Sequence, residues 1–490
     1  MSILNLVEGT WEREIGWRVK LRHLLPPLGL GLLAAALMFW KLGEGSLFNW
    51  DEATYAQVAR EMVWTKDVFS LHRNGVPFLE KPPLYIWLTV MAYKVFGVSE
   101  FAARFWAAVS GIGVVLGTYF VGAQLYSRRV GLAAGVLLLG VNNLAYSHGY
   151  NLLSLSRIGQ MDVPLTFAIV VAMYLGWLGL ERPKYLVWMG VPVGVGLMTK
   201  SAVALFPWTI VALLSVLTQG RRGLGRWQLW VGLLLAVGIA LPWHAGQVAL
   251  HGREFLDVYV GKHLLGRSLS TLDEQYHRQD AAYYLRNICK GFPFWCWLMV
   301  PALAYSVHRI LRERDRAAIF VLAWILLPLC LFSLVQTKIG WYIVIVYPAL
   351  TLMVAAFVEK VLGRRYGWTF VLVAMLLLNP RLPSPRDGSA KHKYVASAIP
   401  YLVGQGDVVL SYEGMNDFVM PADLFYAERL VTVVSGGEKD LRDRLTQLDT
   451  GCAFVLTTTN TWHEGLPGEI VRQTGSHLLV SVCPEGGVSQ

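Results

Sequence analysis

Residues 163–180, VPLTFAIVVAMYLGWLGL, form an uncharged apolar run that directly follows Asp162. The hydrocarbon core of a bilayer is about 30 Å thick and a helix rises about 1.5 Å per residue, so a run of this length predicts a membrane-spanning helix. Similar runs recur along the chain. We predict about eleven spanning helices, at residues 24–42, 104–125, 131–149, 163–180, 185–199, 201–219, 227–246, 292–310, 317–335, 341–359 and 367–380. The sequence therefore predicts a polytopic α-helical membrane protein.

The composition of the chain agrees with a membrane protein. Of its 490 residues, 55% are hydrophobic and only 16% are charged, whereas about a quarter of the residues of a soluble protein are charged. The formal net charge of +10 does not point to nucleic acid, because the basic residues fall in short clusters between apolar runs. Such clusters are typical of membrane topology. We expect membrane lipids as neighbours and no nucleic-acid partner.

The basic clusters also predict which loops face the cytoplasm. We place residues 1–23 in the cytoplasm, as a lead-in that is soluble or interfacial. Pro82–Gly97 is short, begins with two prolines and contains Lys94, so we read it as a juxtamembrane helix that does not cross the membrane. All the clusters between spans then lie inside, as the positive-inside rule requires. They are Arg128–Arg129, Arg182–Lys184, Arg221–Arg226, His308–Arg316 and Lys360–Arg365.

The predicted domain organisation follows from this topology. A transmembrane domain covers residues 24–380 and includes two large external loops, 43–103 with its juxtamembrane helices and 247–291. A Pro-rich stretch at 380–385 ends the last span. Short β-type runs at 408–411, 431–434, 453–458 and 478–482 then predict a small extracytoplasmic α/β domain over residues 381–490.

The five cysteines allow two interpretations. Cys289, Cys296 and Cys330 lie in or beside apolar spans, where a thiol is mostly a small hydrophobic group. Cys452 and Cys483 lie in the C-terminal region, where they form either a disulfide or two buried thiols.

Acidic and basic residues gather on the predicted external face. Asp51 and Glu52 open the first external loop, and Glu80 with Lys81 precede a Pro-Pro pair. Adjacent carboxylates on a helix point in different directions, so one can face a pocket while the other caps the helix or pairs with a base. A lysine suits a phosphate, and a glutamate can hold a divalent cation. The alternatives are a solvated helix start at Asp51 and a headgroup anchor at Lys81.

Three further clusters reach the same boundary. They lie at Ser156–Asp162, Met198–Ser201 and Gln336–Tyr342. Lys200 lies between two apolar runs with almost no loop, so it must reach the interface, pair with an acid or meet an anionic ligand. Asp162 is a candidate acid or base, or else pairs with Arg157. No Walker loop, GxGxxG, HExxH, CxxC or GxSxG motif occurs in the sequence.

At these residues the chain resembles the GT-C superfamily of bacterial transferases, which includes protein O-mannosyltransferases and the lipid A aminoarabinose transferase. The resemblance covers about 340 residues, from the first span to the Thr-Lys-x-x-x-Tyr segment at 337–342. Its motifs are Asp51-Glu52 with Tyr55 and Arg60, Glu80-Lys81-Pro82-Pro83, the element ending at Asp162, Leu197–Lys200, Pro242-Trp243, and His263–Arg267. The chain departs from many relatives at Ile339-Gly340-Trp341, where a Leu-Pro turn is common.

The resemblance implies an inverting glycosyltransferase of the bacterial inner membrane. Its donor would be a sugar on undecaprenyl or another polyprenyl phosphate, and its acceptor a lipid, a glycan or a protein. We assign Asp51 as base or acceptor-positioning carboxylate with Asp162 in support, and we expect cations at the leaving phosphate. The phosphate candidates are Lys81, Arg267, Lys338 and Lys200. The substrate-binding candidates are Glu52, Tyr55, Arg60 and Tyr342, and Glu80 with His263 would hold an optional divalent ion.

Two other functions fit a polytopic chain. A transporter or flippase for lipid-linked substrates would place charged residues in the middle of several spans, whereas here they gather at one end. A non-catalytic scaffold that presents the C-terminal domain would not need Asp51, Glu80, Lys81, Asp162 and Lys338 to converge.

Overall fold

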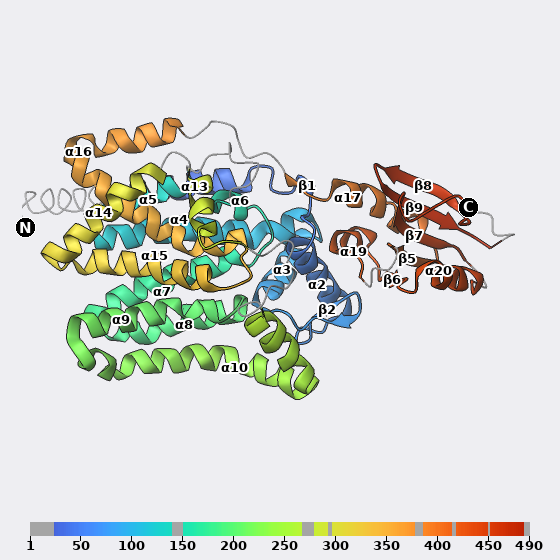
Figure 1. Cartoon of the computed structure of the whole chain (residues 1–490), viewed down its shortest axis with the longest axis horizontal. Helices are drawn as coiled ribbons and strands as arrows, with labels where there is room; N and C mark the ends of the chain where they lie inside the picture. The colour runs from blue at the N-terminus through green and yellow to red at the C-terminus, as the bar shows by residue number, and fades with distance from the viewer. Residues whose placement is uncertain are drawn as a thin grey trace, which may run out of the picture.

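A bundle of apolar helices and a small sheet domain make up the computed structural model, at opposite ends of its long axis (Figure 1). The structure describes residues 24–139, 150–266, 279–292, 296–377, 386–413, 418–448 and 451–484. Helices α2 and α3 lie between the bundle and the sheet. The predicted fold class, a polytopic helical protein with a C-terminal α/β domain, is therefore confirmed in its coarse form.

The bundle is built from long helices that follow the apolar runs. Its first helix is Leu24–Phe39. The others are α4 (Glu100–Leu125), α5 (Arg128–Leu139), α7 (Asp162–Glu181), α8 (Lys184–Thr199), α9 (Phe206–Gln219), α10 (Trp227–Phe255), α14 (Cys296–Glu313), α15 (Arg316–Leu334) and α16 (Tyr347–Leu377). The short helices α6 (Leu152–Leu155) and α13 (Tyr283–Gly291) lie between them. Pro183 at the start of α8, and Asp315 at the start of α15, mark sharp turns between antiparallel neighbours.

The predicted number of about eleven spans is not confirmed. Within the described residues, six helices are long and apolar enough to cross a membrane, and a bent pair of α13 and α14 would make a seventh. Leu24–Phe39, α5 and α8 are shorter than a full span, with 16 residues in α8 and 12 in α5. The second half of the predicted span 131–149 lies outside the described residues. Gly363, at φ 66°, breaks α16 between the predicted spans 341–359 and 367–380.

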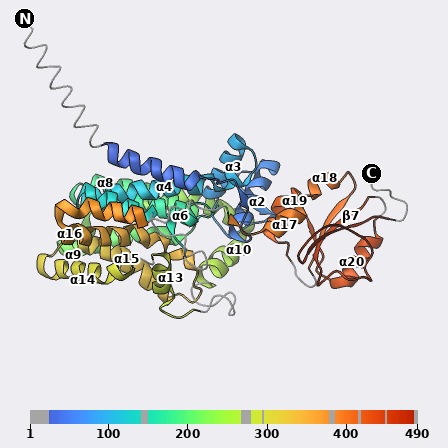
Figure 2. The same ribbon diagram turned by 90° about the horizontal axis from the view of Figure 1, so that it is seen from above.

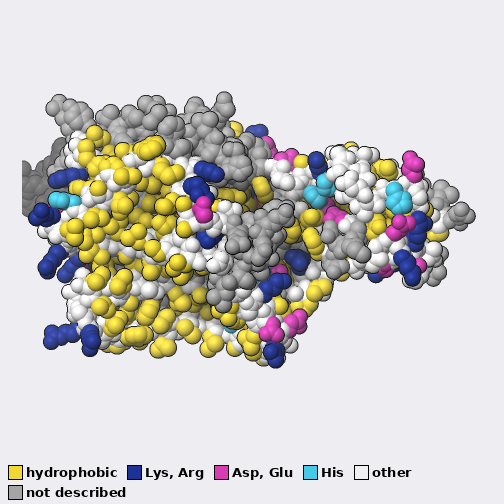
Figure 3. Space-filling view, viewed as in Figure 1, with side chains coloured by type: hydrophobic (Ala, Val, Ile, Leu, Met, Phe, Trp, Pro, Cys, Tyr) yellow, Lys and Arg dark blue, Asp and Glu magenta, His cyan; other side chains and the backbone are white. Residues whose placement is uncertain are grey.

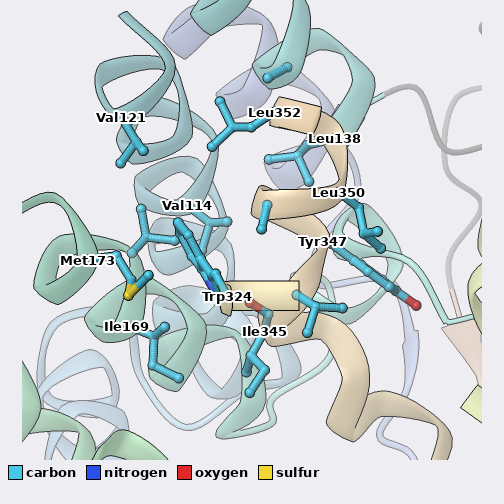
Figure 4. Packing of buried hydrophobic residues seen from close by; sticks show 14 of the residues in the cluster. Val114, Val121, Leu138, Ile169, Met173, Trp324, Ile345, Tyr347, Leu350 and Leu352 are labelled. Carbon is cyan, nitrogen blue, oxygen red and sulfur yellow. Dashed lines mark hydrogen bonds between the residues drawn. The ribbon is translucent and has the colours of Figure 1, made fainter. Parts of the chain in front are cut away.

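Trp324 of α15 lies at the centre of the bundle core (Figure 4). Its indole Nε1 donates to the carbonyl oxygen of Ile345 at 3.0 Å, so the buried donor is satisfied. Val114 of α4 and Met173 of α7 surround the ring. Since these contacts join segments about 200 residues apart in the sequence, the core fixes how the helices are arranged around the bundle.

Helices α2 (Asp51–Thr65) and α3 (Leu84–Phe96) lie within residues 43–103, the segment that the sequence predicts to be an external loop with juxtamembrane helices. Pro83 precedes α3, where its fixed φ suits the start of a helix. Between the two helices lies the short hairpin of β2 (His72–Arg73) and β3 (Val76–Pro77). Helix α3 has 13 residues, too few for a span, which agrees with the prediction that Pro82–Gly97 does not cross the membrane.

The C-terminal domain contains a five-stranded mixed sheet with the order β6-β5-β7-β9-β8. Its strands are β5 (Val408–Tyr412), β6 (Thr432–Val433), β7 (Ala453–Thr458), β8 (Glu469–Thr474) and β9 (His477–Val482). Strand β5 pairs in parallel with β6 and β7, and β9 is antiparallel to β7 and β8. All four predicted strands are present. Strand β8 was missed, because this edge strand is largely exposed and its sequence EIVRQT lacks an apolar pattern.

Helices cover both faces of this sheet. Because side chains alternate along a strand, Phe454 and Leu456 pack with α17 (Ala390–Ala396) and α19 (Pro421–Ala427), while Val455 packs with α20 (Gly437–Thr446) on the other face. The short helix α18 (Ile399–Leu402) follows α17. The domain is therefore a three-layer α/β unit.

The C-terminal domain is joined to the segment 43–103 and the start of α4 by specific contacts. Strands β1 (Gly45–Ser46) and β4 (Arg386–Asp387) pair in parallel. The side chain of Asn74 donates to the carbonyl of Val431 at 2.7 Å and accepts from its amide at 2.9 Å. Lys393 of α17 donates to Glu100 at the start of α4 at 2.6 Å. Viewed from above, α17 and α19 again lie next to α2 (Figure 2).

Two disulfides are present among the cysteines, all of which lie in described segments. Cys452 and Cys483 are bonded, which settles the two readings of this pair in favour of the disulfide. Cys289 and Cys296 are also bonded, so the interpretation of these two residues as buried thiols is wrong. The bend between α13 and α14 brings their Cα atoms to 5.0 Å, within bonding reach. Cys330 is a free thiol, but it is exposed on α15 rather than buried.

Candidate functional site

A cavity of about 570 Å³ opens at the end of the bundle that faces α2 and α3. Six of the predicted site residues line it: Glu80, Lys81, Asp162, Lys200, His263 and Tyr342. They come from five separate stretches of the chain. Most of the remaining wall is apolar and includes Leu165, Phe206, Val237, Leu241 and Phe332. A few ionisable groups at one end of an apolar cavity suit a ligand with an anionic head and an apolar tail.

Asp162 and Lys200 form an ion pair in the cavity wall. Nζ of Lys200 lies 2.5 Å from Oδ1 of Asp162, and both side chains are almost fully buried. Lys200 follows the last residue of α8, while Asp162 is the first residue of α7, where the helix dipole favours an anion. The Lys200 ammonium also lies 4.7 Å from the ring centroid of Tyr342. Lys200 thus pairs with an acid, one of its three predicted alternatives, while the roles of Lys200 towards an anionic ligand and of Asp162 as acid or base stay predictions. Arg157 instead donates to the carbonyls of Leu37, Met38 and Trp40.

Lys81 is the second cation of the cavity. Its side chain is buried although it lies only one residue before the Pro-Pro pair that leads into α3. The charge of Lys81 acts on Asp162, so the two side chains belong to one electrostatic cluster. A buried ammonium beside an apolar cavity is well placed to meet an anionic ligand.

Asp51 lies beside this cluster rather than among the residues that line the cavity. It is the first residue of α2, half-buried, and its charge acts on both Asp162 and Lys200. Lys338 is buried next to the lining residue Thr337, and its ammonium donates to the carbonyl of Val335 at 2.9 Å. The fourth phosphate candidate, Arg267, lies outside the described residues.

Three of the predicted substrate-binding residues lie away from the cavity. Glu52 is buried behind Asp51 and pairs with Arg104 at 2.8 Å. Tyr55 is buried and packs edge-on against Tyr85. Arg60 donates to the carbonyl of Phe425 in the C-terminal domain, and its guanidinium stacks over the Phe425 ring at 4.1 Å. All three side chains are buried in contacts with other parts of the protein, and none of them lines the cavity.

Glu80 and His263 meet at the rim of the cavity, with Oε2 and Nε2 3.6 Å apart. A carboxylate oxygen and an imidazole nitrogen at this separation can bind the same divalent cation, for which both are common ligands. Among the described residues, no third His, Cys, Asp or Glu joins them to complete a metal-binding group. The described residues therefore offer such a cation two ligands at most, and the ion stays a prediction.

His244 and Tyr259, which were not among the predicted site residues, line the same cavity. The two ring nitrogens of His244 contact the carbonyl of Ala240 at 2.8 Å and the hydroxyl of Tyr259 at 3.1 Å. An ionisable side chain within the apolar run 227–246 was the signal that pointed to a functional position.

Surface charge divides the two ends of the bundle. Figure 3 shows a broad apolar surface over the bundle, with lysine and arginine side chains gathered at the end opposite the sheet domain. Exposed basic residues lie in or next to the turns and breaks between helices at this end, and they include Arg128, Arg182, Lys184, Arg221, Arg222, Arg312, Arg314, Arg316 and Lys360. The cavity lies at the other end, so the basic turns and the candidate site are on opposite sides of the apolar surface.

Comparison with known sequences points to one group of proteins. Residues 80–245 match the family model for dolichyl-phosphate-mannose-protein mannosyltransferase. The chain is 29% identical over 352 residues, 69% of its length, to undecaprenyl phosphate-alpha-4-amino-4-deoxy-L-arabinose arabinosyl transferase 1 of Pseudomonas fluorescens strain Pf0-1. It is 28% identical over 366 residues to the corresponding transferase of Pseudomonas aeruginosa. The match spans 58% and 62% of these two relatives, less than two thirds of either.

The fold is shared with two solved membrane proteins. ArnT from Cupriavidus metallidurans, solved with undecaprenyl phosphate, superposes with a TM-score of 0.74 at 17% identity, over 95% of this chain and 98% of that one. The oligosaccharyltransferase AglB from Archaeoglobus fulgidus gives a TM-score of 0.61 at 13% identity, over 90% of this chain and 70% of that one. The arrangement of the helix bundle, the 43–103 segment and the C-terminal domain is thus a fold that these solved structures share.

Proposed function

We propose that this chain, which shares its fold with the GT-C transferases that use polyprenyl-phosphate sugars, is itself a membrane glycosyltransferase. It takes one sugar from a donor in which the sugar is linked to a polyprenyl phosphate, such as undecaprenyl phosphate. It transfers this sugar to a lipid, glycan or protein acceptor. The observation that carries this proposal is the apolar cavity where Lys81, Lys200, Asp162 and Tyr342 meet beside Asp51. The similarity to the arabinosyl transferases supports a polyprenyl-phosphate donor.

The cavity offers each part of such a donor a suitable environment. The isoprenoid chain is apolar and matches the wall formed by residues such as Leu241 and Phe332. The phosphate carries negative charge and is placed near Lys81, with Lys200 and Lys338 adding positive potential. Tyr342 lies against Lys200 and offers the sugar an aromatic face.

Charge development explains why these groups suit sugar transfer. As the bond between the anomeric carbon and the phosphate oxygen breaks, negative charge grows on the leaving phosphate and the sugar gains oxocarbenium character. Fixed ammonium groups in an apolar site stabilise that charge without reorganising. Asp51 accepts the proton of the acceptor hydroxyl as its oxygen attacks the anomeric carbon from the opposite face, which inverts the configuration. Asp162 supports the site by holding Lys200 in place.

A divalent cation would be held by Glu80 and His263. When bound, it would supply positive charge to the phosphate. No third described ligand joins the two side chains, so we treat the ion as an optional component.

The cavity end of the bundle is assigned to the extracytoplasmic side. The exposed basic turns lie at the opposite end, and lysine and arginine are enriched in cytoplasmic loops (Figure 3). The disulfide between Cys452 and Cys483 supports the same orientation, because disulfides persist in oxidising compartments. The C-terminal domain then lies outside the cytoplasm, together with the site.

The test is transfer by the purified protein and its Asp51→Asn variant, which keeps the size of the side chain and removes the base. Glycolipids and glycoproteins from cells with and without the chain are compared by mass spectrometry to identify the sugar and the acceptor. The variant is expected to bind undecaprenyl phosphate normally and to lose transfer. Full turnover by the variant would remove Asp51 from catalysis. Movement of the lipid-linked sugar across the membrane without transfer would favour a flippase, and neither activity would favour a scaffold.

A further inference from the structure

Glu52 and Arg104 form an ion pair that is buried and lies outside the cavity. Their side chains are 0% and 2% exposed, and Nε of Arg104 lies 2.8 Å from Oε1 of Glu52. A buried ion pair contributes little net stability compared with apolar residues of the same size, although breaking it by removing one partner is costly. Net folding stability therefore does not explain why an ion pair occupies this position.

Arg104, on α4, holds the segment that leads into α2. Its Nη1 donates to the carbonyl oxygens of Leu42 at 3.0 Å and Glu44 at 2.9 Å, and its Nη2 donates to that of Ser46 at 2.7 Å. Three backbone carbonyls before Asp51 are thus bound by one guanidinium, whose planar shape fixes their relative positions.

Glu52 accepts hydrogen bonds from backbone amides in two segments, one that leads to Asp51 and one that leads to Asp162. Its Oε2 accepts from the amide of Phe48 at 2.6 Å, while its Oε1 accepts from the amide of Gly159 at 2.9 Å. Phe48 lies just before Asp51, and Gly159 lies three residues before Asp162. One carboxylate therefore connects the two backbone segments that carry the two acidic site residues.

Gly159 is adapted to this contact. A Cβ atom at this position would lie 2.8 Å from the carbonyl oxygen of Ala103 and 3.4 Å from Cγ of Glu52. The first distance is shorter than real Cβ contacts, so a side chain here would push the 157–162 segment away from α4 and Glu52. The close approach requires glycine.

We infer that Glu52 and Arg104 are positioning residues that hold Asp51 and Asp162 in register with each other. The inference rests on the proposed function, in which both carboxylates serve one site. Neighbouring residues on a helix point about 100° apart. Asp51 thus lies towards the cavity cluster while Glu52 points into the core and reaches the backbone that leads to Asp162. A shift of about 1 Å at a reacting group can reduce a rate by about 100-fold.

The chain offers a matched control on the same helix. Glu61 of α2 is as buried as Glu52, and it also accepts from backbone amides, those of Asn74 at 2.6 Å and Gly75 at 3.0 Å. Its contacts lead to the hairpin of β2 and β3 instead of to the cavity. Glu52→Gln and Glu61→Gln therefore each remove a buried carboxylate charge that binds backbone amides, but only Glu52 pairs with Arg104 and connects the two acidic segments.

The experiment compares the two variants with the full-length protein in detergent or nanodiscs. Thermal unfolding, binding of undecaprenyl phosphate, sugar turnover, and hydrogen exchange over residues 47–53 and 157–163 are measured for each. Glu52→Gln is expected to leave undecaprenyl phosphate binding essentially unchanged, to reduce turnover about 100-fold, and to speed exchange in both segments. Glu61→Gln is expected to lower the unfolding temperature while turnover per folded molecule and exchange over 157–163 stay as in the parent.

Two results would overturn the inference: equal losses of turnover in the two variants, or unchanged exchange over 157–163 in Glu52→Gln. If Glu52→Gln does not fold, Gly159→Ala takes its place, since it keeps both charges and displaces only the 157–162 segment. Full turnover by Gly159→Ala would then refute the positioning role, and a loss of turnover with retained undecaprenyl phosphate binding would support it. If the parent protein transfers no sugar, the proposed function fails, and the exchange measurement alone decides whether the pair holds both segments.

Discussion

Lys200 and Asp162 form a buried ion pair across the gap between two helices, with 2.5 Å between Nζ and Oδ1. The lysine comes from the end of α8 and the aspartate from the start of α7. Because both side chains line the cavity, the pair places one positive and one negative charge at the same point of an apolar wall. The negative charge of Asp51 adds to this cluster, so the site combines acids with a fixed cation rather than presenting a uniformly basic pocket.

The first prediction concerns the stability that depends on this pair. Lys200→Met and Asp162→Asn are each expected to destabilise the protein, by about 3–5 kcal/mol if the remaining charge stays buried and less if water reaches it from the cavity. The double variant removes both charges and is expected to be more stable than either single variant. Thermal unfolding of the four proteins in the same detergent gives the coupling energy. Strictly additive effects would show that the two side chains do not interact.

The second prediction concerns the donor phosphate. Lys81→Ala is expected to weaken binding of undecaprenyl phosphate by roughly 10- to 100-fold, because a hydrogen bond to a charged group contributes about 1.5–3 kcal/mol. Lys94→Ala, which removes an exposed lysine from the end of α3, is the control and is expected to bind as the parent does. Binding is measured by calorimetry or native mass spectrometry. Equal affinities for the parent and Lys81→Ala would exclude Lys81 from the phosphate site.

The third prediction concerns the pH dependence of the C-terminal domain. His392 contacts both carboxylate oxygens of Asp423 at 3.0 Å. Burial alone lowers the pKa of His392, but the hydrogen bond and charge of Asp423, with Glu413 nearby, outweigh burial and the charge of Lys391, so its pKa is raised. Since the folded value lies above the unfolded one, the contribution of His392 to stability is complete below about pH 6.5 and is lost as the pH rises through the folded pKa.

The variants that test this are His392→Gln and His477→Gln. The stability lost in His392→Gln is expected to be larger at about pH 5.5 to 6 than above about pH 8. The upper pH lies more than about one unit above the ordinary pKa of histidine, about 6.5. The ring of His477 lies 4.5 Å from that of His392, and burial together with the charge of His392 lowers its pKa. His477→Gln is therefore expected to change the pH dependence in the opposite direction. Thermal unfolding across this range checks both, and a pH-independent effect of His392→Gln would contradict the assigned ion pair.

The fourth prediction concerns the disulfides. Without reductant, the unfolded chain is expected to show one reactive thiol, that of Cys330, and all five after reduction. Replacing Cys452 and Cys483 by alanine is expected to cost about 3–4 kcal/mol of domain stability, because the bond closes a loop with a sequence separation of 31 residues. Thiol labelling with mass spectrometry gives the count, and chemical unfolding gives the stability. Five reactive thiols before reduction would contradict both bonds.

Much of the architecture was predictable because hydrophobic pattern is a local property. The run from Val163 to Leu180 is apolar whatever it packs against, and it forms α7 as expected. The strands β5, β7 and β9 are buried and rich in apolar residues, so their sequences reveal them. The edge strand β8 is not revealed in this way. Where glycine breaks a helix, as at Gly363 in α16, the number of spans also depends on backbone geometry that the apolar pattern does not report.

The candidate site, like the fold, has features that the local sequence predicts and features that depend on how the chain packs. The sequence by itself determined that Lys81, Asp162, Lys200 and Tyr342 lie at one boundary of the apolar runs, because the cost of placing charge in a bilayer fixes the depth of each residue. Only the tertiary structure decided which of the two adjacent carboxylates lies beside the charged cluster of the cavity. Glu52 and Asp51 have the same chemistry and differ in direction, and the burial of Glu52 depends on Arg104 and Gly159, which are more than 50 residues away along the chain. Charge pairing between distant segments is a property of the packed chain, so no local pattern contains it.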